Sequence, residues 1–225
     1  MPSKDSPLFP AEGNLGNASS SGGNAQLGYD AFLLVGFGGP ERPEDVPPFL
    51  ESVLGGRKLP PDRLQELAEP YYLFGGQSPI NAQLRALLTA LIELLRAEGP
   101  PLAVYWGNRH APPFLEEAIQ QMADDGCRRA LAFVTSAFGS YPGCRQYREA
   151  IQQARAAVGP AAPEIHKLRL CFNHPGFIEA AADRVQAVLA QFGEPVRQEV
   201  RLIFTAHSLP IAMAQTSPYQ AQVEE

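Results

Sequence analysis

The sequence is short of cysteine, of basic clusters and of long apolar runs, and each shortage excludes a class of protein. Its three cysteines, widely spaced among 225 residues, form neither a disulfide framework nor a CxxC metal site. No run of Lys or Arg offsets the net charge of −6, so a nucleic acid is not an expected partner. No apolar stretch reaches the roughly 18 residues that span a bilayer, so no transmembrane helix is expected.

The N-terminal segment differs in composition from the rest of the chain. Residues 1–28 are dominated by Gly, Ser, Asn and Pro, with too few apolar side chains to offset the entropy lost on ordering. The sequence therefore predicts a disordered tail there. The segment also lacks the apolar stretch of a secretory signal, and together with the cysteine usage this predicts a cytoplasmic location.

Beyond Asp30, short apolar runs alternate with amphipathic stretches. Because parallel strands need long crossover connections, this alternation predicts a doubly wound, Rossmann-like α/β fold, with a parallel sheet and helices on both faces. One helix carries leucines at three- and four-residue steps, which indicates a core-packing face (Leu84, Leu87, Leu88, Leu91, Leu94 and Leu95). We predict strands at 31–36, 102–106, 130–135, 166–171 and 200–206, and helices at 43–54, 61–73, 80–97, 112–124, 143–158 and 175–192.

The residues that follow the predicted strands carry most of the reactive side chains. Three of the four histidines, His110, His174 and His207, lie at such positions. Phe37 follows the first strand within a glycine turn, and Arg109 follows the second. Since ligands of open α/β sheets bind beyond the carboxyl ends of the strands, the sequence predicts a site at this edge.

Several of these features also have a simpler structural interpretation. The glycine turn at 36–39 resembles a dinucleotide fingerprint, but Glu41 stands where the third glycine belongs and Pro40 lacks an N–H donor, which disfavours nucleotide binding. Ser78 suits a turn or a helix cap. Cys144 begins a predicted helix, where it is either a reactive thiolate or a small half-buried side chain.

His207, by spacing alone, would be a hydrogen-bonded structural residue, but its surroundings resemble a known family. The segment IFTAHSLP at 203–210 is closely similar to the signature of ferrochelatases, which insert ferrous iron into a porphyrin. The FGGP and TSAFGSYPGCRQY forms resemble the actinobacterial branch, whose members are mostly coproporphyrin ferrochelatases. Family segments in the same order, covering about residues 30–225, are LLVGFGGP at 33–40, GGQSPIN at 75–81, YWGNRHAPPF at 105–114, TSAFGSYPGCRQY at 135–147 and CFNHP at 171–175.

The resemblance implies a lyase-type enzyme of haem biosynthesis, with the chelatase fold, that inserts Fe(II) into coproporphyrin III or protoporphyrin IX. Porphyrin and Fe(II) are then its partners, and no dissociable cofactor is required. Cys144 matches a cluster ligand of the iron–sulfur members, but one cysteine cannot hold a [2Fe–2S] cluster.

The resemblance also assigns roles to individual residues. His207 matches the pocket histidine that binds the entering Fe(II) or takes pyrrole protons, which an imidazole can do near neutral pH. Tyr147 and Ser78 match positions that contact the porphyrin and its propionates. Phe37 stands where several Gram-positive members carry a Tyr that ligates product iron, so here this position can only pack against the macrocycle.

The basic side chains for the propionates match the family less completely. Arg109 and His110 fall near the pocket entrance, where their charge would suit carboxylates. Two family arginines align with Leu54 and Pro70, which leaves Arg57 as the nearest basic candidate.

Ferrochelatases have two similar α/β domains with the porphyrin between them, and an acidic residue of a DHxE-like motif in the second domain opposes the histidine. This sequence has no Asp-His dipeptide and ends at Glu225. We expect a first chelatase domain at 29–195 and the start of a second at 196–225, with its remainder missing. Such a chain would be inactive, or would self-associate through an exposed apolar face.

Two other classes of function stay open at this point. One is a different tetrapyrrole chelatase, such as a cobalt enzyme, and the other is a non-catalytic fragment that binds porphyrin or haem. Metal insertion assays with cobalt and iron distinguish the first, and haem titration without metallation distinguishes the second.

Overall fold

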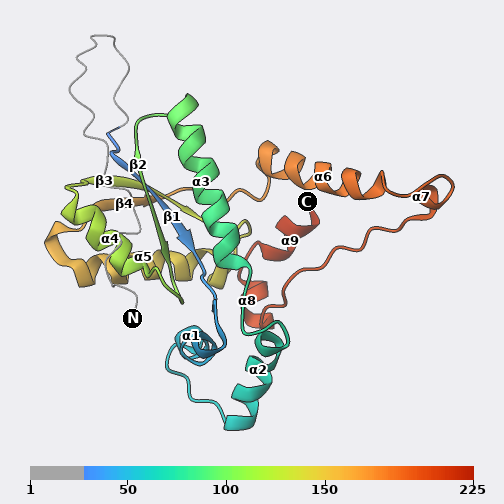
Figure 1. Cartoon of the computed structure of the whole chain (residues 1–225), viewed down its shortest axis with the longest axis horizontal. Coiled ribbons are helices and arrows are strands. Elements are labelled where there is room, and N and C mark those ends of the chain that lie inside the picture. The colour runs from blue at the N-terminus through green and yellow to red at the C-terminus, as the bar shows by residue number, and fades with distance from the viewer. Residues whose placement is uncertain (1–27) are drawn as a thin grey trace, which may run out of the picture.

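The computed structural model describes residues 28–225 (Figure 1). The tail expected at 1–28 lies outside the described residues, apart from Gly28. Four parallel strands form one sheet in the order β2-β1-β3-β4, which confirms the predicted fold class. The strands are β1 (Ala31–Gly36), β2 (Ala103–Asn108), β3 (Arg129–Val134) and β4 (Glu164–Lys167).

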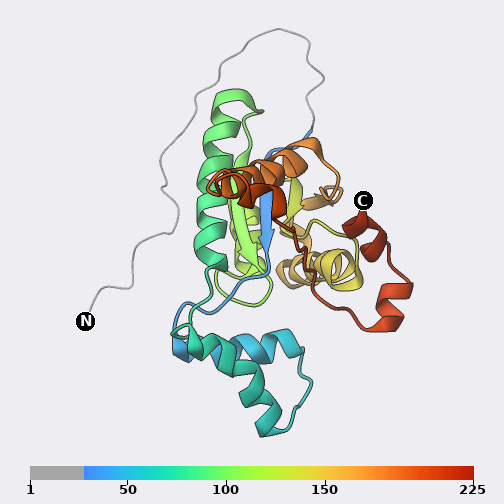
Figure 2. The ribbon, with the colours of Figure 1, turned by 90° about the vertical axis from the view of Figure 1, so that its right-hand side faces the viewer.

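Helices cover both faces of this sheet, as the alternation predicted (Figure 2). α3 (Ile80–Glu98) lies on one face, whereas α4 (Leu115–Asp124) and α5 (Gln146–Val158) lie on the other. The chain enters α5 through a π-helical turn, η2 (Tyr141–Arg145), and leaves it through a short 3-10 turn, η3 (Gly159–Ala161). α4 begins three residues later than predicted, because the helical conformation is disfavoured for Pro112, which precedes Pro113.

The central strand β1 is buried from both sides. Side chains alternate in direction along a strand, so Leu33 and Val35 join the cluster under α4 and α5, whereas Leu34 packs with Leu84 and Trp106 below α3. All three β1 side chains are 0% exposed. The continuous apolar run at 31–35 therefore reflects a strand with helices on each face.

The leucine face of α3 packs on the sheet over only part of its width. Leu84 is 4% exposed, whereas Leu87 and Leu94 are 42% and 55% exposed. The leucines between and beyond them, Leu88, Leu91 and Leu95, are half-buried. The core-packing face is therefore narrower than predicted, because Leu87 and Leu94, seven residues apart, lie on one side of it.

A helical pair lies beyond the carboxyl edge of the sheet (Figure 1). Phe49 of one helix packs against Tyr71 of the other, with ring centroids 5.5 Å apart. Val46 and Leu50 are also buried there, together with Ala111 from the segment after β2. The two helices thus lie next to the strand ends. They are α1 (Val46–Leu54), which follows the 3-10 turn η1 (Pro43–Asp45), and α2 (Pro61–Leu73).

The C-terminal part of the chain packs loosely against this core. None of its four helices has a buried residue. The last helix docks on the loop after β3, where Gly139 N–H donates to Gln222 Oε1 (2.6 Å) and the Phe138 ring contacts Phe177 and Tyr219. The four helices are α6 (Pro175–Leu189), α7 (Val196–Glu199), α8 (Ile211–Gln215) and α9 (Tyr219–Glu224).

The strand predicted at 200–206 is wrong. This segment runs between α7 and α8 (Figure 1) and has no strand partner within residues 28–225. Its side chains are open to solvent, with Ile203 and Phe204 86% and 79% exposed. An apolar, β-branched composition favours a strand only where a neighbouring strand completes the ladder.

The burial pattern predicts which side chains the fold needs. Ile119 is 0% exposed on the core face of α4. Ile119→Ala should lower the unfolding free energy of the protein by about 2–5 kcal/mol, because a cavity replaces the side chain. Val188→Ala, at a position 54% exposed on α6, should change it by less than about 0.5 kcal/mol. Urea titration of both variants measures the difference, and equal losses would contradict this core.

Candidate functional site

The ends of β1 and β2 bring an aromatic and a basic residue together. Gly36 pairs with Asn108 in the sheet register, so the next residues, Phe37 and Arg109, leave the sheet side by side. Arg109 N–H donates to the Gly36 carbonyl (3.1 Å), and His110 N–H donates to the Phe37 carbonyl (3.0 Å). The rings of Phe37 and His110 are packed together, with centroids 4.6 Å apart.

Arg109 is a half-buried cation that forms no ion pair with a carboxylate of the described residues, although the charge of Glu149 raises its pKa slightly. Its guanidinium carbon lies 4.8 Å from the ring centre of Tyr147 and 5.8 Å from that of Phe37. Nη2 donates to Gln146 Oε1 (3.2 Å), but Nε and Nη1 are buried with no hydrogen-bond partner in residues 28–225. Burial lowers the pKa of Arg109, yet a guanidinium stays charged at neutral pH. Such a charge favours an anionic group from a ligand.

His110 brings a neutral ring to the cluster. Burial, and then the positive charge of Arg109, lower the pKa of His110 to about 4. The imidazole is therefore uncharged at pH 7, and its Nδ1 atom lies 3.0 Å from Ser52 Oγ on α1. The charge suited to propionates thus resides on Arg109, whereas His110 offers hydrogen bonding.

Tyr147 is the fourth member of a cluster that also contains Phe37, Arg109 and His110. Its side chain projects from α5 and is 4% exposed. Burial raises the pKa of the Tyr147 hydroxyl, and the nearby Thr135 and Arg109 oppose that rise only in part. The phenol is therefore neutral, and it supports the guanidinium through the face of its ring.

Ser78 lies next to the loop that carries Phe37 and has a local structural contact. Ser78 N–H donates to the Pro40 carbonyl (2.8 Å), and Ile80 N–H donates to Ser78 Oγ (3.4 Å) at the start of α3. A Cβ atom at Gly39 would lie 2.9 Å from Ser78 Oγ, so glycine is needed where the two loops meet. This geometry fits the turn interpretation, since the N-cap of α3 is Pro79 and has no side-chain cap. A ligand contact of Ser78 stays a prediction.

The other predicted site residues lie outside the cluster. Arg57 is exposed just after α1. His207 is exposed on the segment between α7 and α8, and its side chain makes no hydrogen bond to any other described residue. Cys144 is half-buried within η2, ahead of the first turn of α5. No group of three or more His, Cys, Asp or Glu side chains in the described part of the chain lies close enough to hold a metal ion.

The two remaining histidines have structural roles. His174 Nδ1 accepts the Gly176 N–H (3.2 Å) and caps α6. His166 lies between Tyr29 and Glu164, with its ring nitrogens 2.6 and 2.8 Å from their oxygens. His174 therefore lies at the start of a helix, and His166 is a half-buried residue of the edge strand β4.

A cavity of about 700 Å³ opens beside His110. The loop at 39–42, α1, the start of α3 and the segment at 110–114 line it. Two buried amides support its wall: Asn108 accepts the Trp106 indole N–H (2.9 Å), and Asn81 donates to the Gly39 carbonyl (3.1 Å). Neither amide was assigned a role from the sequence, although Asn108 stands at the end of an apolar strand.

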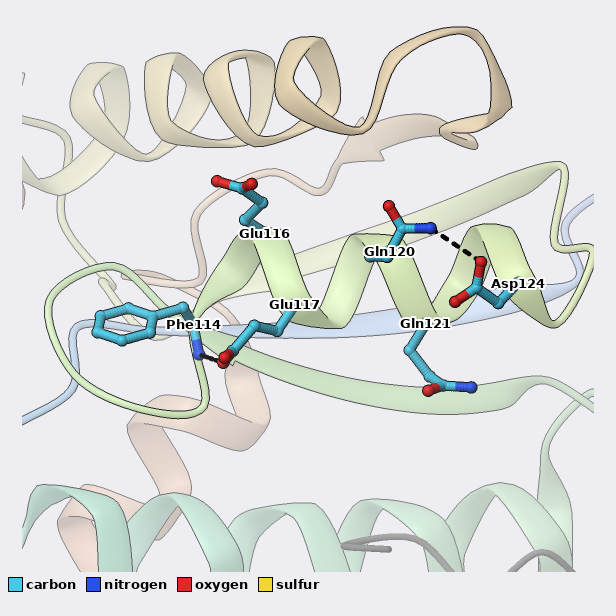
Figure 3. Close-up of a pocket in the computed structure, with 6 residues that line it drawn as sticks. All are labelled: Phe114, Glu116, Glu117, Gln120, Gln121 and Asp124. Atoms are coloured by element: carbon cyan, nitrogen blue, oxygen red, sulfur yellow. Dashed lines mark hydrogen bonds between the residues drawn. The ribbon is translucent and has the colours of Figure 1, made fainter.

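A second, shallow groove runs along the acidic surface of α4 (Figure 3). Its side chains are used locally, since Phe114 N–H donates to Glu117 Oε2 (2.7 Å) and Gln120 donates to Asp124 Oδ1 (2.8 Å). None of the residues that line it hydrogen-bonds to Arg109 or His110. We assign this groove to a solvated helix surface. Its lining residues are Phe114, Glu116, Glu117, Gln120, Gln121 and Asp124.

Comparison with known proteins identifies the family. The ferrochelatase family profile matches residues 29–225. The chain belongs to the ferrochelatase family. It is 55% identical to the coproporphyrin III ferrochelatase of Frankia alni, over 84% of this chain and 48% of the relative. It is 52% identical to the ferrochelatase of Rhodopirellula baltica, over 88% of this chain and 56% of the relative. It is 50% identical to the coproporphyrin III ferrochelatase of Mycolicibacterium smegmatis, over 84% of this chain and 55% of the relative.

Membership of the ferrochelatase family confirms the resemblance found in the sequence motifs. The chain spans about half the length of the curated relatives it matches. Within residues 28–225, every helix is too short or too polar to cross a bilayer.

The low pKa of His110 predicts acid sensitivity. The folded-state pKa of about 4 lies below the ordinary value of about 6.5, so the unfolded chain binds a proton that the folded chain excludes. The unfolding free energy should therefore fall as the pH drops from about 6.5 towards 4, and His110 should have no effect above that window. The full shift corresponds to about 3 kcal/mol, and solvent screening of the half-buried ring reduces this to about 1–2 kcal/mol.

Urea unfolding of the wild-type protein and of His110→Gln at pH 7 and pH 4.5 measures this contribution. The wild type should lose about 1–2 kcal/mol more than the variant. The same pH dependence in both proteins would show that His110 does not cause the loss.

Proposed function

We propose that this chain carries the porphyrin-binding face of a cytoplasmic ferrochelatase that inserts Fe(II) into coproporphyrin III in haem biosynthesis. The observation that carries the proposal is the guanidinium of Arg109, which contacts the rings of Phe37 and Tyr147 and has two buried nitrogens, Nε and Nη1, without a hydrogen-bond partner in residues 28–225. A porphyrin is a flat aromatic ring with carboxylate side chains. Aromatic residues can pack on its face, and a guanidinium can pair with a propionate.

The names of two relatives favour coproporphyrin III as the porphyrin, since both the Frankia alni and the Mycolicibacterium smegmatis proteins are coproporphyrin III ferrochelatases. This porphyrin carries four propionates, whereas protoporphyrin IX carries two. One guanidinium pairs with one carboxylate, so Arg109 accounts for a single propionate of either porphyrin.

In the proposed reaction Fe(II), a substrate, replaces the two pyrrole hydrogens of the macrocycle, and two protons leave. The pyrrole lone pairs must first turn out of the ring plane, and the cost of this distortion must come from binding contacts elsewhere on the porphyrin. Phe37 and Arg109 provide such contacts, one to the ring and one to a propionate. Phe37 has no oxygen, so it cannot ligate the product iron.

His207 is the proposed group for Fe(II) or for the pyrrole protons. Its place in the IFTAHSLP segment supports this role, because an imidazole can bind a metal or accept a proton near neutral pH. We further propose that residues 29–195 act as one chelatase domain and that 196–225 begin a second. This boundary rests on the resemblance to the two-domain family, because α6 before residue 195 and α7 to α9 after it all lack buried residues.

The role of Arg109 is testable by porphyrin binding. Arg109→Gln should weaken coproporphyrin III binding about 10-fold or more, because a charge-assisted hydrogen bond contributes about 1.5–3 kcal/mol. Binding of octaethylporphyrin, which has no carboxylates, should change little. Arg63→Gln, at an exposed position on α2, is the matched control. Soret titrations measure all affinities, and equal losses for both porphyrins would remove Arg109 from propionate binding.

The role of His207 is testable by metal insertion. In a chain completed with a ferrochelatase carboxyl-terminal half, His207→Ala should reduce Fe(II) insertion at least about 100-fold, as expected for loss of a proton-transfer group, and leave coproporphyrin affinity within about two-fold. His174→Ala in the same completed chain, which removes only a helix cap, should keep the wild-type insertion rate. Insertion by His207→Ala at the wild-type rate would contradict this role. Porphyrin binding without any insertion by the completed wild-type chain would favour the non-catalytic alternative.

A further inference from the structure

The first turn of α5 holds the guanidinium of Arg109 with two uncharged side chains. Nη2 of Arg109 donates to Gln146 Oε1 (3.2 Å), and the guanidinium carbon lies 4.8 Å from the ring centre of Tyr147. Gln146 and Tyr147 are the first two residues of α5, whereas Arg109 follows β2, so the hydrogen bond joins residues 37 positions apart. Because an arginine side chain has many rotamers, these contacts restrict the guanidinium before any ligand binds.

The hydrogen bond from Gln146 orients the guanidinium without neutralising it. An amide oxygen accepts a hydrogen bond but carries no net charge, whereas a carboxylate oxygen in the same place would form an ion pair. Glutamine and glutamate have nearly the same size and shape, so at this position they differ mainly in charge. With glutamine there, Arg109 keeps its positive charge for an anionic ligand.

A carboxylate of the same helix also acts on Arg109, but it is bound to other side chains. Glu149 accepts from Arg145 Nε (3.0 Å) through Oε1 and from the Tyr141 hydroxyl (3.3 Å) through Oε2. Its charge only opposes the lowering of the Arg109 pKa by burial, and its ion pair is with Arg145. Two features of α5 thus leave Arg109 unpaired, the neutral residue at 146 and the engagement of Glu149 by Arg145.

We propose that Gln146 is a positioning residue that orients the guanidinium of Arg109 and, because it is neutral, leaves the charge available to a ligand carboxylate. The identity of the ligand rests on the proposed function, in which this carboxylate is a porphyrin propionate. Gln146 acts through Arg109 and needs no contact with the ligand. A side chain with a purely structural role would change stability and ligand affinity in the same direction. This role predicts opposite directions for Gln146→Glu.

Gln146→Glu in the full chain tests the importance of a neutral residue. At pH 7 the new carboxylate should pair with Arg109 and raise the urea concentration at the midpoint of unfolding. It should also weaken coproporphyrin III binding about 10-fold or more, because the propionate must displace a charged partner. Octaethylporphyrin, which has no carboxylates, should bind the variant and the wild type equally. Soret titrations measure both porphyrins.

Gln153→Glu is the matched control, since it adds the same charge at an exposed position of α5, about two helical turns further along. At about 0.15 M salt, where screening acts over about 8 Å, it should leave coproporphyrin affinity within about two-fold. Gln146→Met keeps the length of the side chain and removes the acceptor. It should weaken coproporphyrin binding about 3-fold without raising the unfolding midpoint, because Arg109 loses its orientation but gains no partner.

A double-mutant cycle with Arg109→Gln supplies a measurement that needs no porphyrin. An acidic residue in the first turn of a helix is stabilising by itself, so only the part of the stabilisation that depends on Arg109 reports the pairing. In the Arg109→Gln background, Gln146→Glu should raise the unfolding midpoint by less than half of its effect in the wild type.

Three results would overturn the proposal: equal midpoint shifts in the two backgrounds, unchanged coproporphyrin affinity in Gln146→Glu, or the same loss of affinity in Gln153→Glu or for octaethylporphyrin. If the wild type binds no porphyrin, the proposed function fails. The double-mutant cycle then still decides whether residue 146 controls the pairing of Arg109.

Discussion

The pairing of β1 with both β2 and β3 is the constraint on which the rest of the structure depends. Because all three strands run parallel, their carboxyl ends meet at one edge, and segments about 70 and 100 residues apart in the sequence leave the sheet together. Phe37, Arg109 and Thr135 follow these three strands directly. Their proximity needs no dedicated contact, since the sheet register sets it.

The polar groups at this edge of the sheet lower the stability of the folded chain. Arg109 keeps a charge where water has little access, and its field together with burial makes His110 reluctant to take a proton. The charge of Glu149 offsets this cost only in part, because it forms no ion pair with Arg109. If an anionic ligand binds Arg109 as proposed, its binding should stabilise the fold as well.

Much of the architecture was predictable because it depends on local pattern. β1 was predicted at its observed bounds, since a strand buried on both faces reads as a continuous apolar run, and α2 begins at a proline suited to a first turn. The segment 200–206 was mispredicted because composition does not reveal whether a neighbouring strand is present. Phe37, Arg109 and His110 were found through their place after strands. The contact of Ser52 with His110 was not, because it joins residues 58 positions apart and nothing near Ser52 marks it.

The wall of the cavity contains the single tryptophan of the chain. The indole of Trp106 donates to Asn108, and the guanidinium carbon of Arg85 lies 5.6 Å from its ring centre. A ligand that shifts either neighbour changes the polarity around the indole, and with it the emission of the ring. Since no second tryptophan contributes, the tryptophan emission of the protein comes from this one wall. The molecule therefore carries an optical reporter at its own cavity, and a porphyrin bound there would quench it by energy transfer.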